Sequence, residues 1–309
     1  IPLAGKGTRL RPHTHTQPKP LLHVAGKAIL GHILDTLKEL DVEEVIFITG
    51  DMEEQIKEYV SRNYSYKASY IKQEERLGDG HAISMAKDLV ENDVLIIFVD
   101  TLFDADLSII KTCKEDGFVW TKTVEDYKRF GVVVVNEEGH ITKIVEKPGE
   151  PISKLCMIGL YYLKDGKLLM ETLQELMDKD IRSKGEFRLA DTLGLLLEKG
   201  KKFKAPEVNV WADCGKPETL LETQKWLLRN GHSHVEPVEN SVIIEPVFIE
   251  KGAEIKNSVI GPYVSVAKGA KLENTIIKNS IIASNAIVQE AQLKDSLVGK
   301  GAIVKYYSH

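Results

Sequence analysis

Residues 3–19 read L-A-G-K-G-T-R-L-R-P-H-T-H-T-Q-P-K. A short apolar segment precedes them, and residues 29–40 follow with apolar side chains at helical spacing. This order predicts a loop between the first strand and the first helix of an α/β unit. Gly5 and Gly7 let a ligand approach the backbone, so that successive N–H groups can bind phosphate oxygens. Arg9 adds a planar guanidinium suited to a triphosphate.

Two common phosphate-binding motifs do not fit this loop. The dinucleotide motif requires a third glycine where Leu10 stands. The P-loop motif G-x-x-x-x-G-K-[ST] occurs nowhere in the chain. Lys19 lies between two prolines that hold the chain extended, so it offers a second cation at a defined position.

The loop resembles the signature of the sugar-nucleotide pyrophosphorylases (sugar-1-phosphate nucleotidylyltransferases), L-A-G-G-x-G-T-R-L-x-P-x-T followed by P-K-P-L. The matching positions are Gly5, Gly7, Thr8, Arg9, Leu10, Pro12, Thr14, Pro18, Lys19, Pro20 and Leu21. One glycine of the usual pair is missing, as in the bacterial uridylyltransferase branch. The resemblance implies transfer of a nucleotidyl group from dTTP or UTP to a sugar 1-phosphate, with glucose 1-phosphate as the default sugar. Pyrophosphate is the second product.

Composition and charge describe an ordinary globular protein of 309 residues with a net charge of −5. We therefore expect no binding to nucleic acid or to an anionic membrane. No apolar run approaches the ~20 residues that span a bilayer. Three isolated cysteines favour a reducing compartment, so we expect a cytoplasmic protein. Because Ile1 already lies in the apparent first strand, we also expect native residues to precede it.

The first part of the chain alternates strands and helices. Strands are predicted at 45–49, 68–71 and 94–99, with helices between them. This pattern predicts a Rossmann-like α/β domain with a mixed, mainly parallel sheet. Ligands of such sheets bind at the carboxyl ends of the strands, where the glycine loop, Gln73 and Asp100 all fall.

The last part of the chain repeats. Asn240-Ser-Val-Ile and Asn257-Ser-Val-Ile are followed by Asn274-Thr-Ile-Ile, so the first two steps are 17 residues each. Similar tetrads begin at Asn279 and Asp295. This period predicts a left-handed parallel β-helix of hexapeptides. We therefore divide the chain into a catalytic domain (1–230), a linker (231–239) and a β-helix domain (240–309), through which the chain is expected to form a homo-oligomer.

The resemblance also implies a magnesium site. Mg²⁺ is usually held by one or two carboxylates together with substrate oxygens and water. Asp100 follows a predicted buried strand, where the family carries the aspartate of a Gly-Asp pair; Val99 replaces that glycine. Asp213 matches the aspartate of the family motif W-x-D-x-G-x-x-E. Loop aspartates also cap turns, which is the alternative role for each residue alone.

Binding of the sugar phosphate is implied for Glu146 and Lys147, which match the family's E-K-P. Lys147 would hold the phosphate and Glu146 the sugar hydroxyls. Gly131 and Tyr161 match positions that line the sugar pocket. Glu186 and Asp191 match a further family motif and are interpreted as structural supports.

The nucleotide would be bound by Leu3, Ala4, Gly5, Gly7, Thr8, Arg9, Gln73 and Gly78. The amide of Gln73, five residues before Gly78, could bond O4 and N3–H of uracil or thymine together. The following D-G-H-A, residues 79–82, resembles the uridylyltransferase branch more than the thymidylyltransferase branch. Arg9, Lys19 and Lys147 are the expected catalytic cations.

Two other functions are kept as alternatives. A regulatory paralogue would bind sugar nucleotides without turnover, although its motifs would be expected to decay. A β-helix that also transfers acyl groups would normally use a histidine of the coil as base. No histidine occurs between Ser241 and Ser308, which argues against acyl transfer.

Overall fold

The computed structural model describes residues 1–306, which fall into two units. Unit 1 comprises Ile1–Gly5 and Asp35–Trp211, and unit 2 comprises Lys6–Leu34 and the chain from Ala212 onward. The loop quoted above is therefore divided between them after Gly5. Residues 307–309 of the expected β-helix lie outside the described residues.

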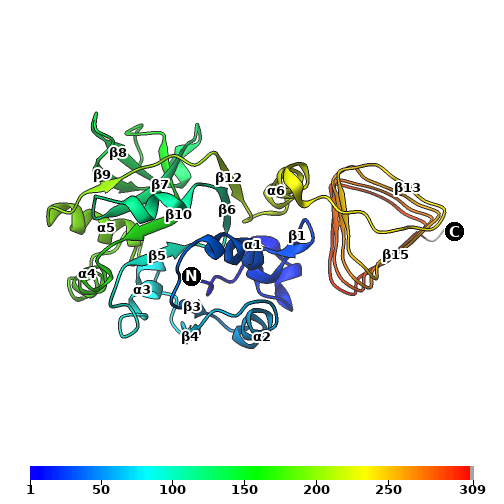
Figure 1. Ribbon diagram of the computed structural model, residues 1–309, viewed down its shortest axis with the longest axis horizontal. Helices are drawn as coiled ribbons and strands as arrows, with labels where there is room; N and C mark the ends of the chain where they lie inside the picture. The colour runs from blue at the N-terminus through cyan, green and yellow to red at the C-terminus, as the bar shows by residue number, and fades with distance from the viewer. Residues whose placement is uncertain (307–309) are drawn as a thin grey trace. The chain divides into compact units, whose positions relative to one another are not determined.

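Unit 1 begins with a parallel strand pair. β3 (Val45–Thr49) pairs with β4 (Ala68–Lys72) along its whole length, and α2 (Glu53–Asn63) connects the two (Figure 1). Pro2 forms a parallel bridge to Ile48 on β3. The strands expected at 45–49 and 68–71 are thus present, joined by the helical crossover that parallel strands require.

The larger sheet of unit 1 is mixed. Its strands are β5 (Val94–Ile97), β7 (Gly117–Thr123), β8 (Gly131–Val135), β9 (Ile141–Glu146), β10 (Leu155–Leu163) and β11 (Phe203–Lys204). β10 runs antiparallel to β5, β7 and β8, while β11 runs parallel to β7. Antiparallel pairing is more extensive than the alternation of strands and helices suggested, because short connections such as residues 136–140 between β8 and β9 permit only antiparallel neighbours.

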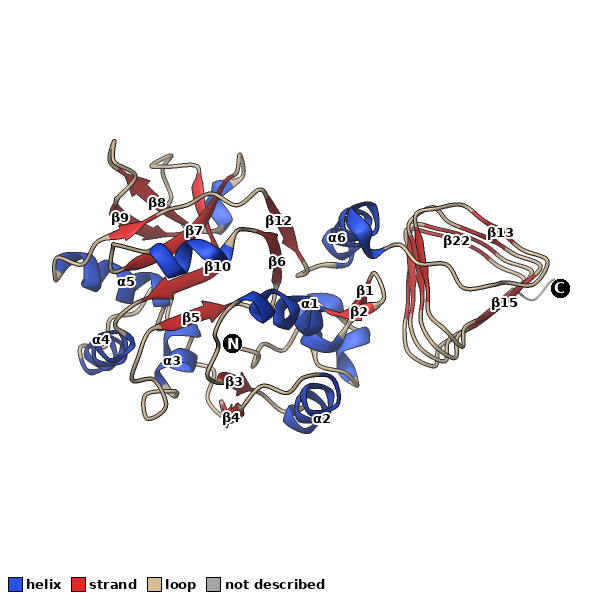
Figure 2. Ribbon diagram, in the orientation of Figure 1, coloured by secondary structure: helices blue, strands red, loops and turns tan. Residues whose placement is uncertain are grey.

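Three helices cover this sheet: α3 (Asp79–Ser84), α4 (Gly166–Asp178) and α5 (Leu189–Glu198) (Figure 2). Their apolar side chains form one core with the strands, in which Val119, Leu173 and Leu193 are fully buried. α3 ends at Ser84, and the chain continues from there only as turns up to Leu89.

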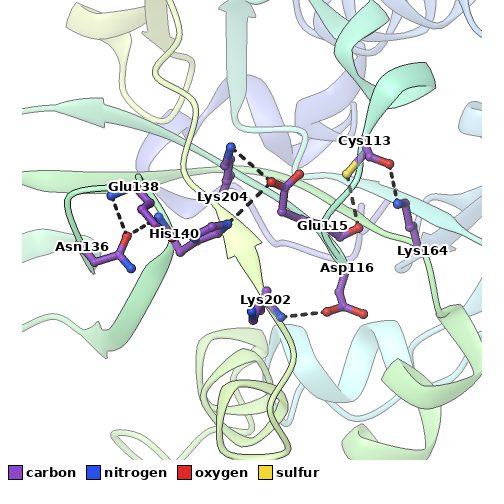
Figure 3. A network of polar contacts seen from close by, with 9 residues as sticks. All are labelled: Cys113, Glu115, Asp116, Asn136, Glu138, His140, Lys164, Lys202 and Lys204. Atoms are coloured by element: carbon purple, nitrogen blue, oxygen red, sulfur yellow. Dashed lines mark hydrogen bonds and ion pairs between the residues drawn. The ribbon is translucent and has the colours of Figure 1, made fainter.

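A polar network ties the edge of this sheet together (Figure 3). Glu115 bonds both Lys204 (3.1 Å) and His140 (3.6 Å), and so joins the segment before β7 to β11 and to the β8–β9 turn. Lys164 donates to the carbonyl of Cys113, and Asp116 accepts from the backbone of Lys202 (2.8 Å). These polar contacts link the segment before β7 to its neighbours in the sheet.

The remaining elements are a short strand pair and the helices and hairpin of unit 2. β6 (Thr101–Asp104) follows β5 and pairs with β12 (Val210–Asp213), whose first residues also belong to unit 1. Unit 2 contains 3₁₀ turns at Thr8–Leu10, His13–His15 and Lys19–Leu21, the hairpin of β1 (His23–Val24) and β2 (Lys27–Ala28), most of α1 (Ile29–Thr36), and α6 (Pro217–Leu227).

The chain beyond α6 winds into a left-handed parallel β-helix of about four coils. Its three sheets are β13 (Val242–Ile243), β16 (Val259–Ile260), β19 (Ile276–Lys278) and β22 (Gln292–Lys294); β14 (Val247–Ile249), β17 (Val264–Val266), β20 (Ser280–Ile282) and β23 (Leu297–Val298); and β15 (Glu254–Lys256), β18 (Lys271–Glu273), β21 (Ile287–Gln289) and β24 (Ile303–Lys305). His234 exchanges backbone hydrogen bonds with Val247 and Ile249, so pairing begins within residues 231–239.

The asparagines of the repeats lie at the corners of the coils. Val242 pairs with Val259 and Val259 with Ile276, so these coils take 17 residues, whereas Ile276 pairs with Gln292, 16 residues later. Asn240, Asn257 and Asn274 occupy one corner with φ between 45° and 55°. Asn tolerates this left-handed conformation better than most residues, so the repeat is a backbone requirement. The tetrads at Asn279 and Asp295 belong to a different corner, aligned with Tyr263.

Candidate functional site

One group of expected site residues gathers at the carboxyl ends of the parallel segments of unit 1. The Leu3 N–H donates to the Ile48 carbonyl (2.6 Å), and the Gln73 N–H donates to that of Thr49 (2.9 Å). The Arg76 Nε donates to the Ala4 carbonyl (3.0 Å). Leu3, Ala4 and Gln73 therefore lie together at the edge of a parallel sheet where ligands usually bind.

The turn from Gln73 to Gly78 is held by the segment before α5. Gly78 has a φ of 127°, and a Cβ there would lie 2.2 Å from the Phe187 carbonyl oxygen. Phe187 also donates its N–H to the Leu77 carbonyl (2.8 Å). Gly78 is thus required by a close backbone contact as well as by its conformation.

Gln73 itself is 5% exposed and has two polar contacts inside the protein. Its Nε2 lies 3.3 Å from the Gly78 carbonyl oxygen and 3.0 Å from the His81 Nδ1. His81 was noted in the sequence only as part of D-G-H-A, and its contact with the amide could not be foreseen from that pattern.

A second group lies on the larger sheet. Gly131 on β8 is paired with Glu146 on β9, and a Cβ at position 131 would lie 2.8 Å from the Glu146 carboxylate. The Met157 methyl carbon would lie closer still, at 2.3 Å, so glycine leaves the space that this methyl group and the carboxylate occupy. Lys147 follows with φ 47°, and its Nζ lies 3.3 Å from Glu146. The structure thus brings Gly131, Glu146 and Lys147 together.

Tyr161 belongs to the same region of unit 1 and is buried, with 5% of its surface exposed. Burial raises the pKa of its hydroxyl, and the carboxylates of Asp79, Glu146 and Asp100 raise it further. The hydroxyl therefore keeps its proton at neutral pH. Asp100 lies between β5 and β6; β5 ends at Ile97, three residues before it, so Asp100 is not directly at the strand end as expected.

Asp79 and Arg188 form an ion pair that the sequence analysis missed. Arg188 Nη1 lies 2.9 Å from Asp79, and the Leu189 N–H donates to the same carboxylate at 2.7 Å. Both side chains are largely shielded from solvent. The pair fixes the turn of Gln73 and Gly78 against α5. Only the chemical complementarity of D-G-H-A and G-E-F-R could have suggested it.

The glycine-containing loop of residues 3–19 lies mainly in unit 2. Gly7 has φ 58°, and a Cβ there would be 3.0 Å from the Thr14 side chain and 3.2 Å from Lys19. Thr14 donates its hydroxyl to the Gly7 carbonyl (2.8 Å). Thr8 and Arg9 are exposed on the following 3₁₀ turn. The T and the P-K-P of the motif therefore shape the loop around Gly7.

Asp213 and Arg9 meet at Gly215, also within unit 2. The Gly215 N–H donates to Asp213 Oδ1 (2.7 Å), and a Cβ at 215 would lie 3.1 Å from Arg9 Nη2. Thr223 of α6 donates to the Asp213 carbonyl (3.0 Å). The absence of a side chain at Gly215 thus lets the Asp213 carboxylate and the Arg9 guanidinium lie near each other. The other proposed metal ligand, Asp100, belongs to unit 1.

No group of three or more His, Cys, Asp or Glu that could hold a metal occurs in residues 1–306. No helix in that part is long and apolar enough to cross a membrane.

Comparison with known sequences identifies the family. The sequence model described as nucleotidyl transferase matches residues 2–230, which is more than half of the chain. The chain belongs to the nucleotidyl transferase family. A second model, described as the GlmU-like C-terminal hexapeptide, matches residues 233–280 of the chain.

Curated relatives agree with this assignment. The bifunctional protein GlmU of Methanocaldococcus jannaschii is 36% identical over 253 residues, covering 81% of this chain and 59% of the relative. The chain thus spans about three fifths of the length of that relative. A UTP–glucose-1-phosphate uridylyltransferase, AglF of Haloferax volcanii, is 32% identical over 232 residues and is covered to 93%.

Solved structures share the fold. A UDP-glucose pyrophosphorylase complexed with UDP-glucose has a TM-score of 0.66 at 24% identity, covering 74% of this chain and 97% of that one. A Bacillus anthracis protein described as a glucose-1-phosphate thymidylyltransferase has a TM-score of 0.63 at 25% identity, covering 73% and 93%. The expected nucleotidyltransferase domain with a C-terminal β-helix is confirmed.

Proposed function

We propose that this protein transfers the nucleotidyl group of UTP or dTTP to a sugar 1-phosphate, with glucose 1-phosphate as the first candidate. The products would be an NDP-sugar and pyrophosphate. Gln73 and Gly78 would bind the base, with Leu3, Ala4 and Gly5 beside them. Gly131, Glu146, Lys147 and Tyr161 would bind the sugar phosphate, and Gly7, Thr8, Arg9 and Lys19 the triphosphate.

The meeting of Arg9 and Asp213 at Gly215 is the observation that carries this proposal. A guanidinium suits the oxygens of a triphosphate, and a neighbouring carboxylate suits the cation that accompanies one. A sugar phosphate is already an anionic nucleophile. The chain therefore needs to hold two anions in line and offset their charge, and little acid–base chemistry is required.

We propose magnesium as the metal, because carboxylates are among the ligands that it prefers. Asp100 and Asp213 would supply carboxylate oxygens, and substrate oxygens and water would complete the shell that Mg²⁺ prefers. When bound, the metal offsets the charge that develops on the transferred phosphoryl group. Arg9 and Lys19 would add fixed positive charge, and Lys147 would orient the attacking phosphate.

No residue from 240 to 306 is a histidine, so the usual base of acyl transfer does not occur on those coils. We propose instead that it serves assembly into a homo-oligomer. The functional division would follow residues 1–230, 231–239 and 240–309, and the protein would act in the cytoplasm.

The test is pyrophosphate release with Mg²⁺ and glucose 1-phosphate, offering UTP, dTTP, GTP, ATP and CTP in turn. Wild type is compared with Asp100→Asn, Asp213→Asn and, as control, exposed Asp41→Asn. We expect release with UTP or dTTP that both site variants lose and the control keeps. Absence of release with every nucleotide across several sugar phosphates would leave the non-catalytic paralogue as the function.

A further inference from the structure

The side-chain amide of Gln73 has a defined orientation. Its Nε2 faces the Gly78 carbonyl oxygen at 3.3 Å. A carbonyl oxygen can only accept, so the NH₂ group of the amide must face it, and the amide oxygen must point elsewhere. This orientation follows from the chemistry of the backbone neighbour and does not depend on distinguishing nitrogen from oxygen.

His81 determines the use of the second N–H. The Gln73 Nε2 also lies 3.0 Å from His81 Nδ1. Because Nε2 is a donor, Nδ1 acts as the acceptor in this contact. Both N–H bonds of the amide are then directed into the protein, one to Gly78 and one to His81.

The amide oxygen is left for a ligand. Within residues 1–306 no hydrogen bond to Gln73 Oε1 is formed. A lone acceptor matches the imide N3–H that uracil and thymine share. Cytosine presents an unprotonated N3 at the same edge, so two acceptors would face each other without a proton. The contact to O4 that the sequence analysis expected from this amide is not available, because both of its donors are engaged.

We propose that His81 is a positioning residue for base selection: by accepting from Gln73, it holds the amide with its oxygen toward the base and so favours UTP and dTTP over CTP. This inference rests on the proposed function. Without the acceptor on His81, only the longer bond to Gly78 holds the amide. The amide can then rotate and offer an N–H to cytosine.

The experiment compares UTP, dTTP and CTP in pyrophosphate release, using the full chain. Variant His81→Leu removes the acceptor, and His81→Met removes it again with a flexible side chain. His81→Asn can place its Oδ1 near the former Nδ1 and serves as conservative rescue. Ser84→Ala is the matched control on the same helix, because the Ser84 hydroxyl bonds the His81 carbonyl and not the Gln73 amide.

We expect the ratio of kcat/KM for UTP to that for CTP to fall at least ~10-fold in His81→Leu and His81→Met. The ratio of UTP to dTTP should stay constant, because both bases carry the same imide. His81→Asn and Ser84→Ala should keep the wild-type ratios. Where CTP turns over too slowly, its inhibition constant against UTP replaces kcat/KM.

A folded His81→Leu or His81→Met enzyme that turns over UTP with an unchanged UTP-to-CTP ratio would overturn this inference and leave the proposed function standing. Equal losses for all three nucleotides would also overturn it, since they would indicate a purely structural role. Wild type without turnover of any nucleotide would instead refute the proposed function. The three results are distinguishable in one set of assays.

Discussion

At two positions of the candidate site, glycine leaves space that neighbouring side chains fill. Gly131 makes room for the carboxylate of Glu146, and Gly215 makes room for Asp213 and Arg9. Neither has a positive φ, so conformational freedom is not the reason for glycine at these positions. A methyl group there would move a charged side chain, and misplacement by about 1 Å can cost ~10²-fold in rate.

Substituting Gly131→Ala should therefore lower kcat/KM for the sugar phosphate by about 10- to 100-fold, because the new Cβ displaces both the Met157 methyl group and the Glu146 carboxylate. Steady-state kinetics at saturating UTP measure this. Gly149→Ala is the matched control, since a Cβ at position 149 meets nothing within 4 Å. Equal activity of the two variants would contradict a role for Glu146 in binding the sugar.

Arg9 and Arg11 provide a second comparison, because both are exposed on the same turn but only Arg9 approaches Gly215. Arg9→Ala should reduce turnover by ~10²–10³, the usual cost of a lost electrostatic donor. Arg11→Ala should change it little. Pyrophosphate release under saturating substrates is the measurement, and similar losses in both variants would show that general positive charge matters rather than placement.

At the scale of elements, α6 is joined to the coils of unit 2 by one buried side chain. Gln224 is fully buried; its Oε1 accepts from Ser265 (2.6 Å) and from the Ala25 N–H (3.4 Å). Its Nε2 donates to the carbonyls of Tyr263 (3.0 Å) and Ser280 (3.1 Å). The helix that follows Asp213 is thereby linked to two successive coils and to the β1–β2 hairpin.

Gln224→Leu should lower the free energy of unfolding by about 2–4 kcal/mol, because it leaves several buried polar groups without partners. Gln174→Leu is the control: its exposed amide bonds only Asp178 on the same helix. Urea unfolding followed by circular dichroism compares the two. A change below ~0.5 kcal/mol in Gln224→Leu would show that water or neighbouring groups replace the lost bonds.

Unit 2 also contains a histidine, His23, whose pKa is shifted by the fold. Burial lowers the pKa of His23 below its ordinary value of 6.5, while Glu250 of the first coil partly opposes the shift. A folded-state pKa below the unfolded one means that stability is complete above pH 6.5 and is lost as the pH falls toward the folded pKa.

His23→Gln cannot titrate, so its free energy of unfolding should fall less than that of wild type between pH 8 and pH 5. Urea unfolding at both pH values measures the difference. His15→Gln, at an exposed position, should behave as wild type. A wild-type protein whose stability rises on acidification through this range would contradict the sign.

At the scale of the molecule, the β-helix packs against residues 6–34 of the same unit. A Cβ on Gly26 would lie 2.2 Å from the Phe248 ring, and Gly299 of the last coil lies close to His13. Arg229 stacks on Tyr263, 4.7 Å from the ring centre, and bonds its hydroxyl. The coils are thus part of the structure that supports residues 6–34.

A chain that ends at Asn230 should therefore lose stability and raise the KM for UTP, because the contacts of Gly26 and Gln224 disappear with the coils. A chain that ends at Ala291 keeps those contacts and should retain far more of both. Thermal unfolding and steady-state kinetics compare the two. Wild-type values for the shorter chain would show that residues 6–34 hold their conformation without the β-helix.

Features encoded in contiguous residues were predictable from the sequence. The parallel pair at 45–49 and 68–71 and the β-helix follow from local patterns of apolar spacing and corner asparagines. Such patterns act through the conformational preferences of neighbouring residues, which a single sequence displays directly.

Only the tertiary structure decided which distant groups meet. The acceptor role of His81 toward Gln73, the pairing of Asp79 with Arg188, and the four bonds of Gln224 join residues far apart or on different elements. The antiparallel course of β10 and the meeting of Arg9 with Asp213 depend likewise on the path of the whole chain. A polar residue can satisfy its hydrogen bonds with many partners, so its type and spacing alone do not specify which one the fold provides.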